Sequence, residues 1–165
     1  MTLLHLCQWL YASSFATAIR ESQYGFPIIE TMHVLGITVL VGTVAIVDLR
    51  LLGVLMKCEP VSEILEQLLP LTWCGFLIMF SSGSLLLFSK AAEYYWNPIF
   101  RIKLVLLLLA GLNPLIFHST IYRSVATWSE SRVTPIRAKL AGAFSLTIWS
   151  AIIVAGRAIA YFHHR

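Results

Sequence analysis

The stretch from Pro27 to Met56 constrains this chain more than any other part of its sequence. Between Thr31 and Val47 it contains no Lys, Arg, Asp or Glu, which is the pattern of a helix that crosses a lipid bilayer. Glu30 and Asp48 lie near its two ends, 18 residues apart, which is five helical turns and about 27 Å of rise. The sequence therefore predicts one acidic side chain near each membrane boundary, both on the same face of this helix.

The composition extends this conclusion to the whole chain. Of its 165 residues, 58% are hydrophobic and only 12% are charged, values that lie outside the usual range of soluble domains. The twelve Lys and Arg residues are dispersed at the ends of apolar segments, so we expect them at the membrane interface rather than on nucleic acid. We predict one integral membrane domain over residues 1–165, surrounded by the lipid bilayer and able to form a homo-oligomer or join a larger membrane complex.

The sequence predicts five transmembrane helices. The apolar segments of the required length are Thr2–Ile19, Pro27–Met56, Gln67–Ser89, Leu104–Tyr122 and Leu140–Tyr161. A short charged segment that begins at Pro60 precedes the third span and is expected to lie at the membrane interface. Pro114 follows Asn113 inside the fourth span, where it should kink the helix. The expected fold is an all-α bundle of five transmembrane helices with one short interfacial helix.

This topology sorts the ionisable side chains into two groups by depth. The first group lies about 6 to 10 Å inside a helix end near one membrane face and consists of Glu30, His33, Lys103 and Arg157. His164 lies two helical turns beyond Arg157. The group expected near the opposite face consists of His5, Asp48, Arg50 and His118. Because His33 and His118 fall at different depths, we do not expect them to bind one planar cofactor.

The first group indicates a b-type haem site. A neutral His33 would be one axial ligand and His164 the second. The propionates would be neutralised by basic side chains, namely Arg157, Lys103 or Arg101. Two alternatives use the same residues. In one, Glu30 pairs with Arg157 or Lys103 in an intramembrane ion network that needs no cofactor. In the other, Glu30-x-x-His33 is half of a di-iron pattern, whose second half the sequence lacks.

The second group favours structural roles. Asp48 is expected to form a salt link with Arg123 or Lys139 at the helix end. His5 and His118 are each expected to make an ordinary hydrogen bond, with a second haem site as the alternative. Copper is a further alternative because methionine and cysteine are soft ligands, although the methionines and the three cysteines do not recur at ligand spacing on one helix.

The sequence contains no pattern of a soluble enzyme. A nucleophile elbow, a phosphate-binding glycine loop, HExxH and a Walker motif are all absent. We therefore expect a b-type haem-binding or redox-accessory membrane protein, which could be a subunit of a larger complex. Copper or small-solute transport and a structural assembly subunit without cofactor are the alternatives.

Three stretches carry a resemblance to a known family. They are PIIETMHVLGITVLVGTVAIVDLRLLG in the second predicted helix, NPIFRIKLVLLLLAGLN in the fourth and LTIWSAIIVAGRAIAYF in the fifth. Over nearly its whole length the chain resembles an uncharacterised family of small multi-helix proteins of the bacterial inner membrane, with a DLRLLG motif. This resemblance implies a multi-pass protein of that membrane and no known activity.

A more distant similarity rests on a His early in a Gly-containing helix that ends in Arg, and on a later helix that opens on Lys. In these features the chain is similar to HemJ-type protoporphyrinogen oxidases, which are haem proteins, and to CopD-type copper resistance proteins. This similarity implies a haem-ligand role for His33 and a functional role for Lys103. The chain differs from both groups by its additional first helix and by Arg157 in its last helix.

Overall fold

The computed structural model describes residues 3–121, 134–159 and 161. These residues form helices and connections and contain no strand. The helices, in chain order, are α1 (Leu3–Ala12), α2 (Ser14–Glu21), α3 (Gly25–Leu52), α4 (Val61–Trp96), α5 (Pro98–Ile116), the π-helical turn η1 (Phe117–Ile121) and α7 (Ile136–Ile159). The expected all-α class is therefore confirmed for this part of the chain.

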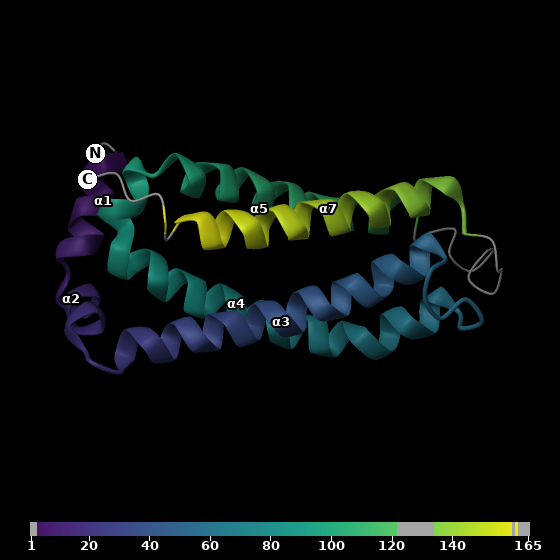
Figure 1. Cartoon of the computed structure of the whole chain (residues 1–165), viewed down its shortest axis with the longest axis horizontal. Coiled ribbons are helices and arrows are strands. Elements are labelled where there is room, and N and C mark those ends of the chain that lie inside the picture. The colour runs from purple at the N-terminus through teal and green to yellow at the C-terminus, as the bar shows by residue number, and fades with distance from the viewer. Residues whose placement is uncertain (1–2, 122–133, 160, 162–165) are drawn as a thin grey trace.

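Four helices of the described ranges, α3, α4, α5 and α7, are long and apolar enough to cross a membrane. Each runs antiparallel to the one before it (Figure 1). α3 packs against both α4 and α7, and α5 packs against α7, whereas α4 and α5 touch little beyond their connection. The chain is thus built as a multi-pass membrane protein, with four spans in the described residues instead of the five predicted.

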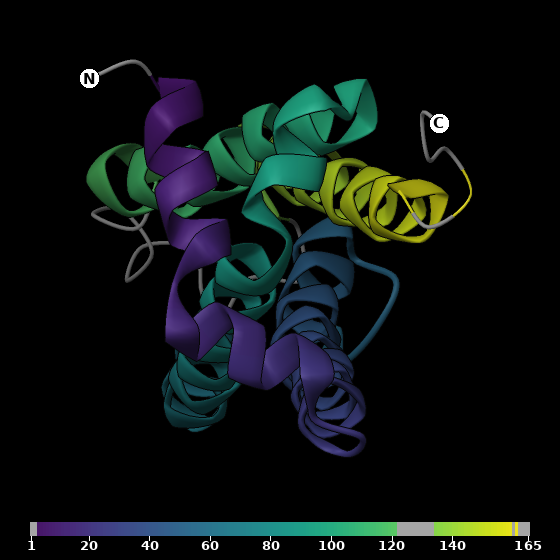
Figure 2. The same ribbon diagram turned by 90° about the vertical axis from the view of Figure 1, so that its left-hand side faces the viewer.

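The predicted first span, Thr2–Ile19, is wrong because the helix breaks at Ser13. The backbone of Ser13 is extended (φ −63°, ψ 144°), and its hydroxyl accepts from the N–H of Ala16 and donates to the carbonyl of Leu10. The break leaves helices of ten and eight residues, which are too short to cross a bilayer. α1 and α2 instead lie across the end of the bundle where α3 begins (Figure 2). The predicted topology had placed the N-terminus at the other end, beside the loop that follows Arg50.

The predicted interfacial helix is also wrong, because its residues form the first turns of α4. Pro60 is extended (φ −60°, ψ 134°) and stands directly before this helix, where its missing N–H costs no hydrogen bond. α3 ends before Met56 because Gly53 takes a left-handed conformation (φ 74°) that closes the helix. The side chain of Asn97 caps α5, which therefore begins before Leu104, the predicted start of the span.

Two of the long helices are interrupted. α4 is non-helical at Lys90 (φ −128°, ψ 25°), and the neighbouring Ser89 carbonyl accepts from Arg20 Nη1 at 3.0 Å. Arg20 also donates to the Tyr11 carbonyl and stacks on the ring of the same residue, so it ties α1 and α2 to the break in α4. α5 continues through Pro114, where the sequence predicted a kink, and the π-helical turn η1 follows its end at Ile116.

Two glycines bring α3 and α4 into backbone contact. A Cβ atom on Gly36 in α3 would lie 2.7 Å from the amide nitrogen of Met79. A Cβ atom on Gly75 in α4 would lie 2.7 Å from the amide nitrogen of Leu40. Small residues permit this close approach between membrane helices, where van der Waals packing rather than the hydrophobic effect holds the helices together.

Replacing Gly36 or Gly75 by Ala should destabilise the bundle, because the added methyl group meets backbone that cannot move aside. We expect each change to cost about 1 to 3 kcal/mol, the usual range for overpacking, measured as a lower midpoint of thermal unfolding in detergent. Gly42→Ala is the matched control in the same helix, since nothing lies within 4 Å of its added Cβ. Equal midpoints for Gly36→Ala and Gly42→Ala would contradict this packing.

Candidate functional site

His33 is held between α3 and α4 through its Nδ1 atom. This atom lies 3.0 Å from the carbonyl oxygen of Met79 and 3.1 Å from the hydroxyl oxygen of Ser82. A carbonyl oxygen can only accept, so Nδ1 carries a hydrogen and donates it. In the neutral ring, Nε2 is then the nitrogen with an available lone pair. Gly83 lies against the ring, because a Cβ at this position would be 2.9 Å from His33 Cε1.

Lys103 reaches the level of His33 from α5. Its Nζ lies 3.5 Å from the position that a Cβ would occupy at Gly156 in α7, so the lysine side chain follows the surface that this glycine leaves free. The ammonium group of Lys103 and the carboxylate of Glu30 both act electrostatically on the His33 ring. Residues from α3, α4, α5 and α7 therefore meet at this depth, whereas the sequence prediction named residues of α3, α5 and α7 alone.

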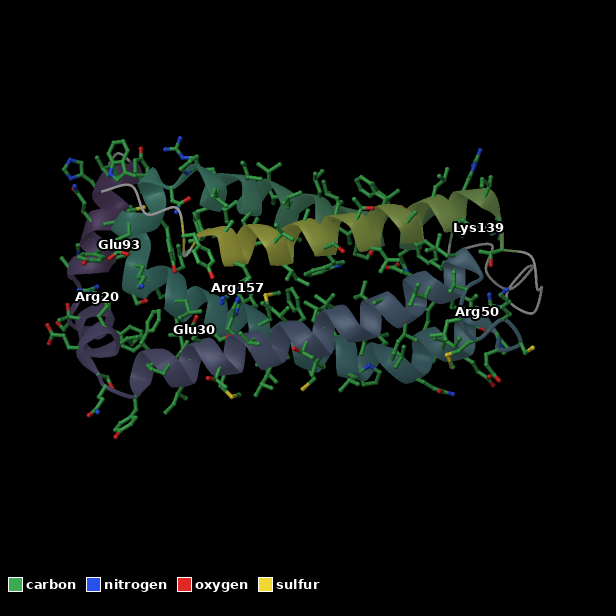
Figure 3. The ribbon with its side chains drawn as sticks, viewed as in Figure 1. Arg20, Glu30, Arg50, Glu93, Lys139 and Arg157 are labelled. Carbon is green, nitrogen blue, oxygen red and sulfur yellow. The ribbon has the colours of Figure 1, made fainter. Side chains whose placement is uncertain are left out.

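Arg157 and Glu30 face the space between α7 and α3. Figure 3 shows the Arg157 side chain leaving α7 on the side of α3, where Glu30 lies. Both side chains are exposed, whereas His33 and Lys103 are half-buried. Within the described part of the chain, Glu30, Lys103 and Arg157 form no ion pair at 4.0 Å or less. The alternative network in which Glu30 pairs with Arg157 or Lys103 is therefore not formed.

Ser82 and Gly83 are residues of this site that the sequence prediction missed. The small residues from Ser81 to Ser84 indicate only close helix packing. The signal that could have found them is their depth, because α4 runs antiparallel to α3 and Ser82 comes level with His33. The buried hydroxyl of Ser82 therefore lies beside the His33 ring.

Arg101 is not brought to the site. The guanidinium of Arg101 donates to the Tyr95 carbonyl at 3.1 Å and lies 5.6 Å from the centroid of the Tyr95 ring. Arg101 is therefore engaged at the α4–α5 connection and exposed there. His164, the predicted second axial ligand, lies outside the described residues.

Arg50 occupies the opposite end of α3 as a structural anchor. Its side chain is only 2% exposed. Nε donates to the Glu59 carbonyl at 2.9 Å, and Nη1 donates to the Thr134 hydroxyl at 3.5 Å. Arg50 thus joins the end of α3 to the turn before α4 and to the start of α7, without a carboxylate partner among these contacts.

Asp48 does not form the salt link predicted for it with Lys139. The carboxyl group is 5% exposed and is hydrogen-bonded by the side chain of Ser145 in α7. Its other predicted partner, Arg123, lies outside the described residues. The acid at this end of α3 is therefore buried against a hydroxyl group and not against a charge.

The structure separates His5 and His118. His5 lies on α1, at the end of the bundle where α3 begins, and His118 lies in η1 at the other end (Figure 1). Both side chains are exposed. The two ligands of the alternative second haem site are therefore not brought together. The described ranges also contain no group of three or more His, Cys, Asp or Glu side chains placed to hold a metal ion.

A family model described as a family of unknown function (DUF6644) matches residues 10–162. The chain therefore belongs to this family, and the resemblance to an uncharacterised membrane family is confirmed to that extent. The match includes α3, α4, α5 and α7 in full, and with them every residue of the candidate site. Comparison with curated proteins and with solved structures finds no match to this chain.

His33 should exist as the tautomer with hydrogen on Nδ1, because the Met79 carbonyl requires a donor. Isotope-edited NMR of histidine-labelled protein in micelles should show a ring of this kind that belongs to His33. Its signals should disappear in His33→Gln and persist in His118→Gln, which serves as the control. Ser82→Ala should leave the tautomer unchanged, since the carbonyl acceptor remains. A His33 ring with its hydrogen on Nε2 would contradict the hydrogen bond seen here.

Proposed function

We propose that this member of a family of unknown function binds a b-type haem within the membrane, with His33 as an axial ligand. Its role would be that of a redox-accessory protein of the bacterial inner membrane, working as a subunit of a larger complex. The observation that carries the proposal is the hydrogen bond from His33 Nδ1 to the Met79 carbonyl. Metal-binding histidines are usually oriented in this way by their second nitrogen, which leaves Nε2 for iron.

The charges around His33 fit the periphery of such a cofactor. Lys103 and Arg157 lie near the same membrane face and form no ion pair within 4.0 Å in the described residues. Unpaired charges inside a membrane-spanning length are costly and commonly mark a functional site. Two propionates would supply anionic partners for these two side chains. Haem itself would supply one-electron chemistry, and this chain would supply the ligand, its orientation and the neutralising charge.

A distant similarity to HemJ-type and CopD-type proteins, which is part of this proposal and is not shown by the family match, would point to the same assignment. It rests on the position of His33 early in α3, on the arginine that closes that helix, and on Lys103 near the start of α5. The structure shows contacts for two of these residues. His33 is hydrogen-bonded to α4, and the side chain of Lys103 runs along α7 at Gly156. A test of haem binding in variants of His33 and Lys103 therefore examines the residues on which this similarity rests.

The decisive experiment is an optical spectrum of the protein purified after expression with haem supplied. We expect a Soret band that is lost in His33→Ala. Ser82→Ala should keep the band but weaken haem affinity about tenfold, the lower range for loss of a group that orients a metal ligand. Lys103→Gln and Arg157→Gln should weaken binding while leaving the band position unchanged.

His5→Ala is the matched control, because His5 is exposed on α1 and distant in sequence from the site. It should bind haem as the unchanged protein does. The proposal fails if the purified protein shows no Soret band, or if His33→Ala retains the whole band. Metal analysis of the same samples measures copper as well as iron.

Lys103 and Arg157 form no ion pair with another described residue, which favours a second function, the binding of an anionic small solute. In that case the haem-free protein would be the active form. Lys103→Gln and Arg157→Gln would each reduce solute binding, whereas His33→Ala would leave it nearly unchanged. Thermal stabilisation by a panel of small carboxylates, measured on all three variants, separates this function from haem binding.

A further inference from the structure

Asp48 is the most confined acidic side chain of the described residues. It is 5% exposed, and its Oδ2 atom is buried without any hydrogen-bond partner. α7 packs closely on this part of α3, since a Cβ on Gly142 would lie 3.0 Å from the Asp48 carbonyl oxygen. The hydroxyl of Ser145, one turn further along α7, is the group that hydrogen-bonds the carboxyl.

Among the described residues, the charged groups on the surrounding elements form no ion pair with this carboxyl. On α3 itself, Arg50 donates to the Glu59 carbonyl and to Thr134. On α7, Lys139 makes no ion pair with Asp48. At this end of the bundle, the described titratable side chains of the neighbouring elements also include Arg137 of α7, His118 of η1, and Glu63 and Glu66 of α4, and all four are exposed.

An ionised carboxylate in this position would leave one oxygen without a hydrogen bond, and without a counter-charge from the described residues, inside a membrane-spanning helix. Such a state is expensive, because burial of an unpaired charge is opposed by the full loss of its hydration. A bound metal cation would not satisfy the carboxylate, since hard cations require several oxygen ligands and Ser145 is the one polar side chain of the described residues on the carboxyl. Protonation removes the charge with no further ligand.

We propose that Asp48 is a proton-binding site, a carboxylic acid that holds its proton in the α3–α7 interface beside Ser145. The site lies four residues from the end of α3, or about 6 Å of helix rise, so its proton can exchange with the adjacent membrane face. It is independent of the haem proposal, because His33 lies 15 residues earlier in the same helix, about 22 Å away along the axis.

Infrared spectroscopy of the protein in lipid bilayers tests this proposal. At neutral pH we expect a carbonyl stretching band of a protonated carboxylic acid, which shifts in heavy water and is lost in Asp48→Asn. Asn has nearly the same shape as Asp and removes the buried charge, so this variant should fold. Ser145→Ala should keep the band and shift its frequency, because one hydrogen bond to the carboxyl is removed.

Glu30→Gln is the matched control, since Glu30 is an exposed acid on the same face of the same helix. It should leave the band intact, whether or not haem binds. The proposal is overturned if no band depends on Asp48 at neutral pH, which would show an ionised group. It is equally overturned if the band is absent in sodium or potassium buffer and present in choline buffer, which would show a cation site.

Discussion

The backbone contact between α3 and α4 is the constraint on which the rest of the structure depends. Gly36 meets the amide of Met79, and Gly75 meets the amide of Leu40, so the two helices are fixed in register as well as in distance. Because they are antiparallel, this register brings His33 to the Met79 carbonyl and the Ser82 hydroxyl. A shift of one helical turn between the helices would remove both hydrogen bonds. The orientation of the His33 ring is therefore a consequence of helix packing at Gly36 and Gly75, which have no functional side chain.

The position of α7 decides which end of α3 is open. Glu30 and Asp48 share one face of this helix, as their spacing of five turns requires. At the Asp48 end Gly142 lets α7 approach closely, and the acid is buried. Figure 1 shows α3 and α7 diverging toward the other end, where Glu30 and Arg157 are exposed. The same face of α3 thus carries a buried acid, Asp48, at one end and an exposed acid, Glu30, at the other.

The sequence was sufficient to predict the four spanning helices and the common depth of Glu30, His33, Lys103 and Arg157, because both follow from apolar length and helical rise. It was not sufficient at Ser13, whose side chain caps α2 and breaks the predicted first span, or after Pro60, where the predicted interfacial helix continues into the span as α4. A serine within an apolar run is compatible with a continuous helix, and the break at Ser13 accompanies the packing of α1 across the bundle end. Side-chain partners were the least predictable, since they depend on the register between helices.

The charged groups of the bundle are accommodated in ways that follow from their chemistry. Arginine carries several donors on a long side chain, so Arg50 can be buried and still reach the backbone carbonyl of Glu59. Lysine has a long apolar stem, which lets Lys103 run along α7 at Gly156 while its ammonium group stays at the level of the polar site. Aspartate has neither property, because its carboxyl group is one methylene from the backbone and can only accept hydrogen bonds when ionised. With the Ser145 hydroxyl on the carboxyl and Oδ2 left without a partner, a bound proton is the simplest way for Asp48 to remain where α7 encloses it.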